Sequence, residues 1–216
     1  MTALWQHSYE ISSLLTNSQG RLGFYALLQV LQDTAVRHAL ELNLGRDVMA
    51  KQNLFWVLTR QKVEMNHWPT MGQILTARTW LRVQADGFVV RDFSLHGEDG
   101  TDWGKATTSW LTLNAETRRP VKIDAQAMLQ GIAREESTGL LAPKIRALEA
   151  YSELARLQVR NSDIDGNQHV NNTRYGQWIL DALPFEHHKR SVVQGYEVNF
   201  LAETRLGDTI VIEKGQ

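Results

Sequence analysis

Hydrophobic residues recur at steps of three and four between residues 22 and 42, with polar residues filling the other positions. This spacing places the apolar side chains on one face of a helix of about five turns, and Gly45 just beyond it is a typical stop signal. The apolar positions are Phe24, Leu27, Leu28, Leu31, Ala35, Ala39 and Leu42.

Four segments after this helix are rich in β-branched and aromatic residues, at 54–65, 74–83, 88–96 and 103–113. Turn residues separate them, including Asp86-Gly87 between the second and the third. Short segments of this kind with turns between them predict an antiparallel meander, and its apolar face needs the helix as a cover.

The C-terminal part of the chain repeats features of the N-terminal part at fixed offsets. Three pairs share an offset of 150: Tyr25 with Tyr175, Asn17 with Asn167, and Gln19 with His169. Two pairs share an offset of 135: Val63 with Val198, and Gly72 with Gly207. We therefore predict two copies of one unit, each made of a strand, a helix and a sheet.

The predicted division is an N-terminal unit at 1–123, a polar, Ala-rich linker at 124–150, and a C-terminal unit at 151–216. The second unit is expected to begin with a strand at 154–160 and to contain a helix from about 172 to 183, which Pro184 ends. Fewer residues follow Gly207 than follow Gly72, so we expect either a truncated second sheet or a different closure of it.

Composition excludes several functional classes. The net charge of -1 gives no general attraction to nucleic acid, and no apolar run is long enough to span a membrane. The start of the chain resembles neither a signal peptide nor a transit peptide, which predicts a cytoplasmic and bacterial protein. Without cysteine there is no thiol nucleophile or thiolate zinc site, and the scattered histidines predict no metal and no cofactor.

The candidate chemistry lies in NSDIDGNQHVNNTRY, residues 161–175. Asp165, Asn167 and His169 stand two residues apart, so in an extended segment their side chains would share one face. The amides from Val170 to Asn172 begin the second helix, where we expect them to hold a developing oxyanion.

This segment resembles the catalytic segment of acyl-acyl carrier protein (acyl-ACP) thioesterases, and the resemblance covers more than this loop. It implies an α+β tandem (double) hot dog fold, in which each long helix is wrapped by a curved antiparallel sheet. It also implies an enzyme of lipid metabolism that hydrolyses fatty acyl-ACP to free fatty acid and ACP. Catalysis would belong to Asp165, Asn167, His169 and Glu203.

The residue after Glu203 is Thr204, where plant relatives commonly have Cys, so direct attack by water is our hypothesis. We assign Glu203 as general base, with its pKa raised by partial burial, and His169 to polarise the carbonyl or share the proton transfer. Asn167 would hold the carbonyl or the water. Asp165 would fix the loop or the imidazole, or serve only as a turn former. Asn171 and Asn172 are interpreted as helix caps.

In the N-terminal unit, Gln19 and Trp68 stand where we place His169 and Glu203, so this unit cannot run the same chemistry. We expect it to shape an acyl tunnel walled by Trp56, Trp80, Trp110 and the Leu residues of the helix. For each aromatic taken singly, an ordinary core position is the favoured interpretation.

An acidic carrier protein calls for a basic docking patch, with residues 187–190 and 118–122 as candidates. The alternative functions are an acyl-CoA thioesterase with the same site, a non-catalytic acyl-chain binding protein or, with less support, a hot dog dehydratase. A monomer and a homodimer are both compatible with two fused units.

Overall fold

The computed structural model describes residues 2–83 and 88–215, whose strands form a six-stranded antiparallel sheet in the order β1-β3-β4-β5-β2-β7 and a two-stranded sheet of β6 and β8. The turn predicted at Asp86-Gly87 lies outside the described residues. In the described ranges, the helices are all too short or too polar to cross a membrane.

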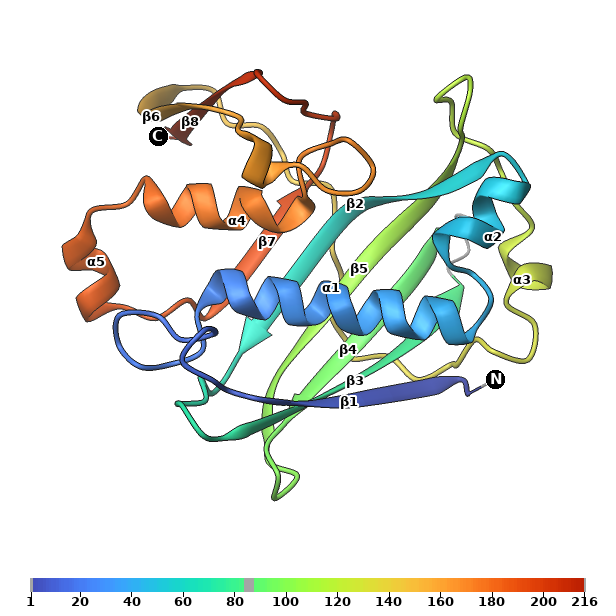
Figure 1. The fold of residues 1–216 in the computed structure, drawn as a ribbon, viewed down its shortest axis with the longest axis horizontal. Coiled ribbons are helices and arrows are strands. Elements are labelled where there is room, and N and C mark those ends of the chain that lie inside the picture. Colours follow the sequence, from blue (N-terminus) through green and yellow to red (C-terminus); the bar gives the residue numbers. More distant parts are fainter. Residues whose placement is uncertain (1, 84–87, 216) are drawn as a thin grey trace.

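The predicted long helix is confirmed as α1 (Phe24–Glu41), which lies across one face of the six-stranded sheet (Figure 1). Its predicted apolar face forms the centre of the core, since Leu27, Leu28 and Leu31 are at most 2% exposed. Together with aromatic and aliphatic side chains from the strands, these residues form the largest hydrophobic cluster. The burial of this face, rather than helix propensity alone, holds α1 in place.

The predicted meander is also confirmed. Its strands are β2 (Leu54–Met65), β3 (Ile74–Val83), β4 (Val89–His96) and β5 (Asp102–Asn114), and β1 (Leu4–Glu10) pairs with β3. The short helix α2 (Arg46–Lys51) links α1 to β2. The pairing of β2 with β5 shifts register at Thr59, where one extra residue bends β2.

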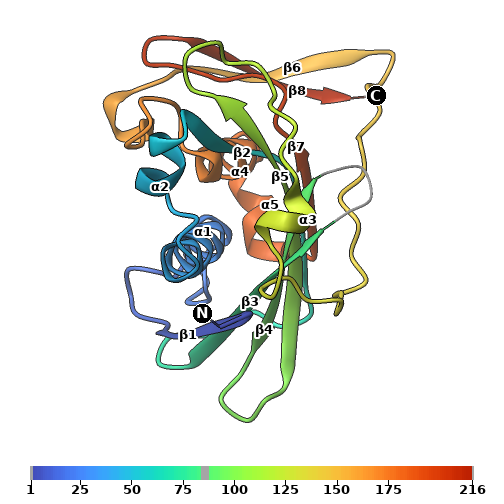
Figure 2. The same ribbon diagram turned by 90° about the vertical axis from the view of Figure 1, so that its right-hand side faces the viewer.

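The C-terminal half joins the same sheet, because β7 (Gly195–Asn199) pairs with β2. Its strands β6 (Tyr151–Gln158) and β8 (Thr209–Gly215) form the separate pair, close to the predicted position of the opening strand (Figure 2). The predicted second helix is α4 (Asn172–Asp181); the short helices η1 (Asn161–Asp163) and α5 (Phe185–Arg190) flank it.

Helix α4 packs against α1 at Gly176. A Cβ atom added to Gly176 would lie 2.6 Å from Cδ1 of Leu28 and 2.9 Å from Cε1 of Phe24. The missing side chain therefore allows the two helices to approach closely.

The segment between the two halves begins with α3 (Ala125–Met128) and then crosses the sheet on the face opposite α1 (Figure 2). Hydrogen bonds attach it there: the amide of Arg134 donates to the Leu81 carbonyl at 2.9 Å, and the Trp80 indole donates to the Glu136 carbonyl at 2.7 Å.

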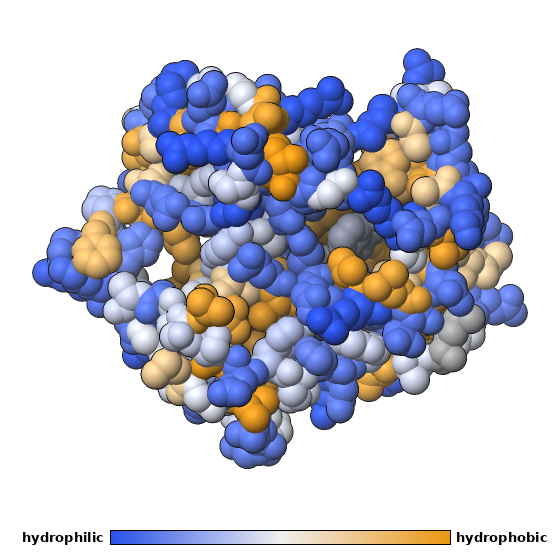
Figure 3. Space-filling view, viewed as in Figure 1, coloured by the Kyte–Doolittle hydropathy of each residue, from blue (hydrophilic) through white to orange (hydrophobic). Residues whose placement is uncertain are grey.

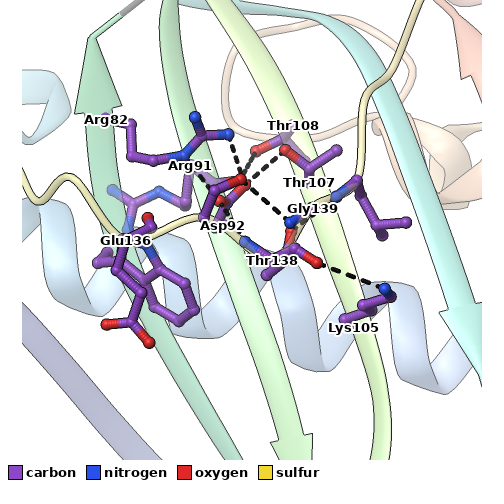
Figure 4. A network of polar contacts seen from close by, with 12 residues as sticks. Arg82, Arg91, Asp92, Lys105, Thr107, Thr108, Glu136, Thr138 and Gly139 are labelled. Carbon is purple, nitrogen blue, oxygen red and sulfur yellow. Dashed lines mark hydrogen bonds and ion pairs between the residues drawn. The ribbon is translucent and has the colours of Figure 1, made fainter.

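A buried carboxylate completes this attachment (Figure 4). Asp92 is fully buried, and its side chain accepts hydrogen bonds from Arg82 at 2.7 Å, from Thr107 at 2.6 Å and from the amide of Thr138 at 3.2 Å. The predicted linker is therefore bound to the sheet.

A second buried polar pair lies on the α1 side. The Arg91 guanidinium donates to Nδ1 of His38 at 2.9 Å, while Nε2 of His38 lies 3.0 Å from the Thr2 carbonyl. Burial, with the charge of Arg91, lowers the pKa of His38 to about 4, and burial lowers the pKa of Arg91 to about 9. Near neutral pH the imidazole is therefore neutral, which allows its Nδ1 to accept from the charged guanidinium.

Candidate functional site

The segment from Ile164 to Val170 is a tight hairpin turn, and these two residues form an antiparallel bridge. The amide of Asp165 donates to the His169 carbonyl at 2.9 Å, and Oδ1 of Asp165 accepts from the Asn167 amide at 2.8 Å. The prediction of an extended segment was therefore wrong. An Asx turn bends this chain, so Asp165 is at least a turn former, as one interpretation held.

The hairpin places His169 beside Glu203 although the two residues lie far apart in the sequence. Nε2 of His169 lies 3.2 Å from Oε2 of Glu203. Their segments run side by side because the Val170 amide donates to the Thr204 carbonyl at 2.9 Å. The imidazole is 20% exposed and the carboxylate 33%, so both reach solvent from a partly sheltered position.

Two arginines flank the carboxylate. Arg118 forms an ion pair with Oε1 of Glu203 and packs over the Phe55 ring at 4.4 Å, while Arg205 lies 3.9 Å from Oε2. Positively charged groups therefore lie on both sides of the Glu203 carboxylate. The assignment of Glu203 as general base stays a prediction.

Sequence reasoning named Arg118 only as part of a carrier-docking patch and did not predict its ion pair with Glu203. Arg118 follows β5 in a turn where its own φ is 57°, a left-handed conformation that only a few per cent of non-glycine residues adopt. Nothing in the residue pattern of 114–120 predicts this conformation or the partner in the other half of the chain.

The His169 imidazole is arranged to stay neutral. Partial burial lowers its pKa below the usual value, the charges of Arg118 and Arg205 lower it further, and Asp165 acts in the opposite direction. A neutral imidazole can accept a proton from water or donate its own N–H to a carbonyl oxygen.

Asn167 and Asn171 have different positions. Asn167 is exposed at the tip of the hairpin, and its predicted role of holding the carbonyl or the water stays a prediction. Asn171 is the N-cap of α4: its Oδ1 accepts from the Thr173 amide at 3.0 Å and from its hydroxyl at 2.7 Å. Its predicted capping role is confirmed, whereas Asn172 is the first residue of the helix rather than its cap.

The amides that we expected to hold an oxyanion are largely occupied. The Val170 amide donates to Thr204, and the Asn171 amide donates to the Asp163 carbonyl at 2.9 Å. That expectation was therefore wrong for two of the three amides. The Tyr175 hydroxyl donates to Oγ1 of Thr204 at 2.8 Å, which is consistent with a structural Thr204.

A cavity of about 330 Å³ lies between this hairpin and α1. Asp165 lines it, but His169 and Glu203 do not, and most of its lining is polar. It therefore does not suit an apolar acyl chain. In the described part of the chain, no group of three or more His, Asp or Glu side chains is placed to hold a metal ion.

The N-terminal half contains a matching hairpin. The Asn17 amide donates to the Arg21 carbonyl at 2.7 Å, and Oδ1 of Asn17 accepts from the Gln19 amide at 2.9 Å. Asp165, His169 and Asn167 make the same two hydrogen bonds in the C-terminal hairpin. Corresponding residues of the two hairpins are therefore 148 positions apart in the sequence (165 minus 17). The prediction of 150 was wrong: Arg21, not Gln19, is the counterpart of His169.

The offset of 135 holds for the segments beside the hairpins. The Leu22 amide donates to the Pro69 carbonyl at 2.8 Å, as the Val170 amide does to Thr204. Since Trp68 directly precedes Pro69, it is the counterpart of Glu203, as predicted. The two halves thus share a backbone framework but differ in the side chains that could do chemistry.

Comparisons with known proteins agree with this arrangement. Residues 2–130 match the N-terminal domain of acyl-ACP thioesterases, and residues 146–215 match their C-terminal domain. The palmitoyl-ACP thioesterase of Gossypium hirsutum is 31% identical over 193 residues, a match that covers 82% of this chain and 45% of the relative. The oleoyl-ACP thioesterase 1 of Arabidopsis thaliana is 27% identical over 221 residues, which covers 94% of this chain and 60% of the relative. The chain thus spans about half the length of the curated relatives.

Solved structures resemble it over nearly its whole length. An acyl-ACP thioesterase from Bacteroides thetaiotaomicron superposes with a TM-score of 0.88 at 26% identity, covering 97% of this chain and 85% of that one. The 12:0-ACP thioesterase from Umbellularia californica has a TM-score of 0.79 at 19% identity, covering 95% and 84%, and supports the fold alone. With both domains matched, this chain belongs to the acyl-ACP thioesterase family and has its hot dog fold.

Proposed function

We propose that this chain hydrolyses fatty acyl-ACP to free fatty acid and ACP through Asp165, Asn167, His169 and Glu203. The observation that carries the proposal is the 3.2 Å contact between His169 and Glu203 in the C-terminal half. The equivalent positions of the N-terminal half hold Arg21 and Trp68, which cannot form such an acid–base pair. Family membership supplies the substrate class.

The proposed reaction is a direct attack by water. Glu203, with His169, removes a proton from a water molecule as its oxygen bonds to the thioester carbonyl carbon. Asn167 donates a hydrogen bond to the carbonyl oxygen as negative charge develops on it. The carbon–sulfur bond then breaks, and the proton held by the pair passes to the sulfur to give the free thiol of the carrier. Asp165 acts by fixing the hairpin that positions Asn167 and His169.

Basic side chains near this site suit an acidic carrier protein. Arg205 is 68% exposed beside Glu203, and Arg46 donates to the Gly166 carbonyl at 2.9 Å. Of the patches predicted from sequence, 118–122 lies at the site. The other, at 187–190, lies beyond the far end of α4, and Lys189 there pairs with Glu186 at 2.9 Å (Figure 1). The carrier is therefore proposed to dock around Arg118 and Arg205.

The N-terminal half is proposed to shape the acyl pocket. The proposal keeps the predicted division into an N-terminal unit at 1–123, a linker at 124–150 and a C-terminal unit at 151–216. Trp56 and Trp110 pack around the buried cluster of Leu42 and Val89, on the α1 side of the sheet. Trp80 lies on the other face of the sheet. Side chains along β3 alternate between the two faces, and Trp80 points away from α1, where its indole donates a hydrogen bond to the Glu136 carbonyl. The prediction that Trp80 lines the same wall was wrong.

The test compares hydrolysis of acyl-ACP and acyl-CoA of equal chain length. We expect a higher kcat/KM for the carrier-bound substrate, because the acidic surface of a carrier protein can contact Arg118, Arg205 and Arg46 together. A preference for acyl-CoA would identify the chain as an acyl-CoA thioesterase. Binding of acyl groups without hydrolysis of either substrate would identify an acyl-chain binding protein.

The pH dependence tests the role assigned to Arg118. Removing its charge with Arg118→Gln should raise the pKa of His169, because this guanidinium favours the neutral imidazole. The acidic limb of kcat/KM, where His169 becomes protonated, should therefore move to higher pH. The measurement is a pH–rate profile, with Arg78→Gln on β3 as the control. An unchanged acidic limb in Arg118→Gln would contradict the role of His169 as a proton acceptor.

A further inference from the structure

The N-terminal counterpart of the catalytic site is hollow. A cavity of about 190 Å³ is lined by Asn17, Gln19, Arg21 and Trp68, the four residues that correspond to Asp165, Asn167, His169 and Glu203. Figure 3 shows an opening in the surface on this side of the molecule, bordered in part by hydrophobic residues. The duplicated framework has therefore kept a pocket where the reactive side chains are missing.

The pocket has a cationic rim. Arg21 is exposed, and in the described ranges no carboxylate pairs with its guanidinium. None of the thirteen residues that line the pocket is acidic. An uncompensated guanidinium beside a cavity favours an anion with planar oxygens, such as a carboxylate.

The walls of the pocket are apolar and built from both halves of the chain. Phe24 and Trp68 pack edge to face with ring centroids 6.4 Å apart, and the Trp68 indole donates to the Val193 carbonyl at 2.8 Å. Leu180 from α4 contributes a further wall. Such walls suit an alkyl chain rather than a sugar or a nucleotide.

A polar contact lies at the rim of the cavity. Nε2 of Gln19 donates to the His188 carbonyl at 2.5 Å, and this connects the hairpin to α5. The cavity volume is smaller than the roughly 300–1,000 Å³ of pockets for drug-sized ligands. It has room for a head group and the first few methylene groups that follow it.

We infer that this pocket binds an alkyl carboxylate, with the carboxylate on Arg21 and the alkyl chain against Phe24, Trp68 and Leu180. The inference goes beyond the proposed hydrolysis, since no bond is made or broken here. It also does not require that the other half be active. A ligand of this kind would connect the hairpin at 17–22 to α4 and α5.

The test is calorimetric titration of the full chain with octanoate. The Arg21→Gln variant should bind at least about tenfold more weakly, as expected for the loss of a charge-assisted hydrogen bond. Arg78→Gln, which removes an exposed arginine on β3, is the matched control and should bind like the parent chain. Since the Arg21 side chain is exposed, its replacement should leave the melting temperature unchanged.

Two further comparisons separate this pocket from other sites. His169→Gln should bind octanoate as the parent does, whereas acetate and octylammonium should bind at least about tenfold more weakly than octanoate, because each lacks one of the two recognised features. The inference is overturned if the parent chain does not bind octanoate, if Arg21→Gln binds as the parent does, or if His169→Gln abolishes binding.

Discussion

Replacing His169 with glutamine is expected to lower the rate of acyl-ACP hydrolysis by a factor of about 10² to 10⁴, the usual contribution of a general acid–base group. Glutamine keeps a hydrogen-bonding side chain of similar reach but cannot accept the proton. Glu203→Gln should cause a loss of similar size, because the carboxylate lies 3.2 Å from the imidazole and shares the same proton. The measurement is kcat on acyl-ACP at saturating substrate.

The double variant distinguishes a coupled pair from two independent groups. If His169 and Glu203 act as a unit, their combined replacement should cost little more than the worse single replacement. His96→Gln, at the end of β4, is the control for histidine loss and should keep the parent rate. Full activity in either site variant would place the chemistry elsewhere, and additive losses would show that the two residues do not share a proton.

Asp92→Ala is expected to lower the free energy of unfolding by about 3–5 kcal/mol, the usual cost of removing one partner of a buried ion pair. The carboxylate has no exposed surface, and its loss leaves Arg82, Thr107 and the Thr138 amide without their acceptor (Figure 4). The Asp92→Asn variant should lose less, since a carboxamide oxygen can still accept some of these bonds. Chemical denaturation gives the free energy of unfolding directly.

A surface pair is the matched control. Glu153 and Arg156 lie 2.6 Å apart with about half of each side chain exposed, so Glu153→Ala should cost less than about 1 kcal/mol. Protease digestion provides a second readout, because loss of the Asp92 contacts should make residues 134–140 easier to cleave. If Asp92→Ala matched Glu153→Ala in stability, the attachment of this segment would not depend on the carboxylate.

The elements of the N-terminal half were predictable because their patterns are local. The limits expected for β2 and β3 agree with the structure to the residue, since turn residues bound segments that are buried on a regular period. The second helix was predictable from its N-terminal asparagines and Pro184 for similar reasons.

The site itself was only partly predictable. The resemblance pointed to His169 and Glu203, and the structure places them together. The residue pattern offered a turn as one of the interpretations of Asp165, and the structure shows that turn. The ion pair of Arg118 with Glu203 was not predicted, because it depends on a left-handed turn and on a contact between distant segments. The offset of 150 followed from a chance match of two tyrosines, while the repeat is defined by the turns at Asn17 and Asp165 together with backbone hydrogen bonds, which carry no sequence signal.

The pairing of β7 with β2 has a consequence for how the two halves hold together. Gly195–Asn199 of the C-terminal half forms the sheet edge next to a long strand of the N-terminal half. If the two halves were separated, β2 of the N-terminal half would expose a row of unpaired amides and carbonyls, and β7 of the C-terminal half would have no strand to pair with. We therefore expect the two halves to melt in a single transition, and a cut in the connecting segment to leave both fragments associated.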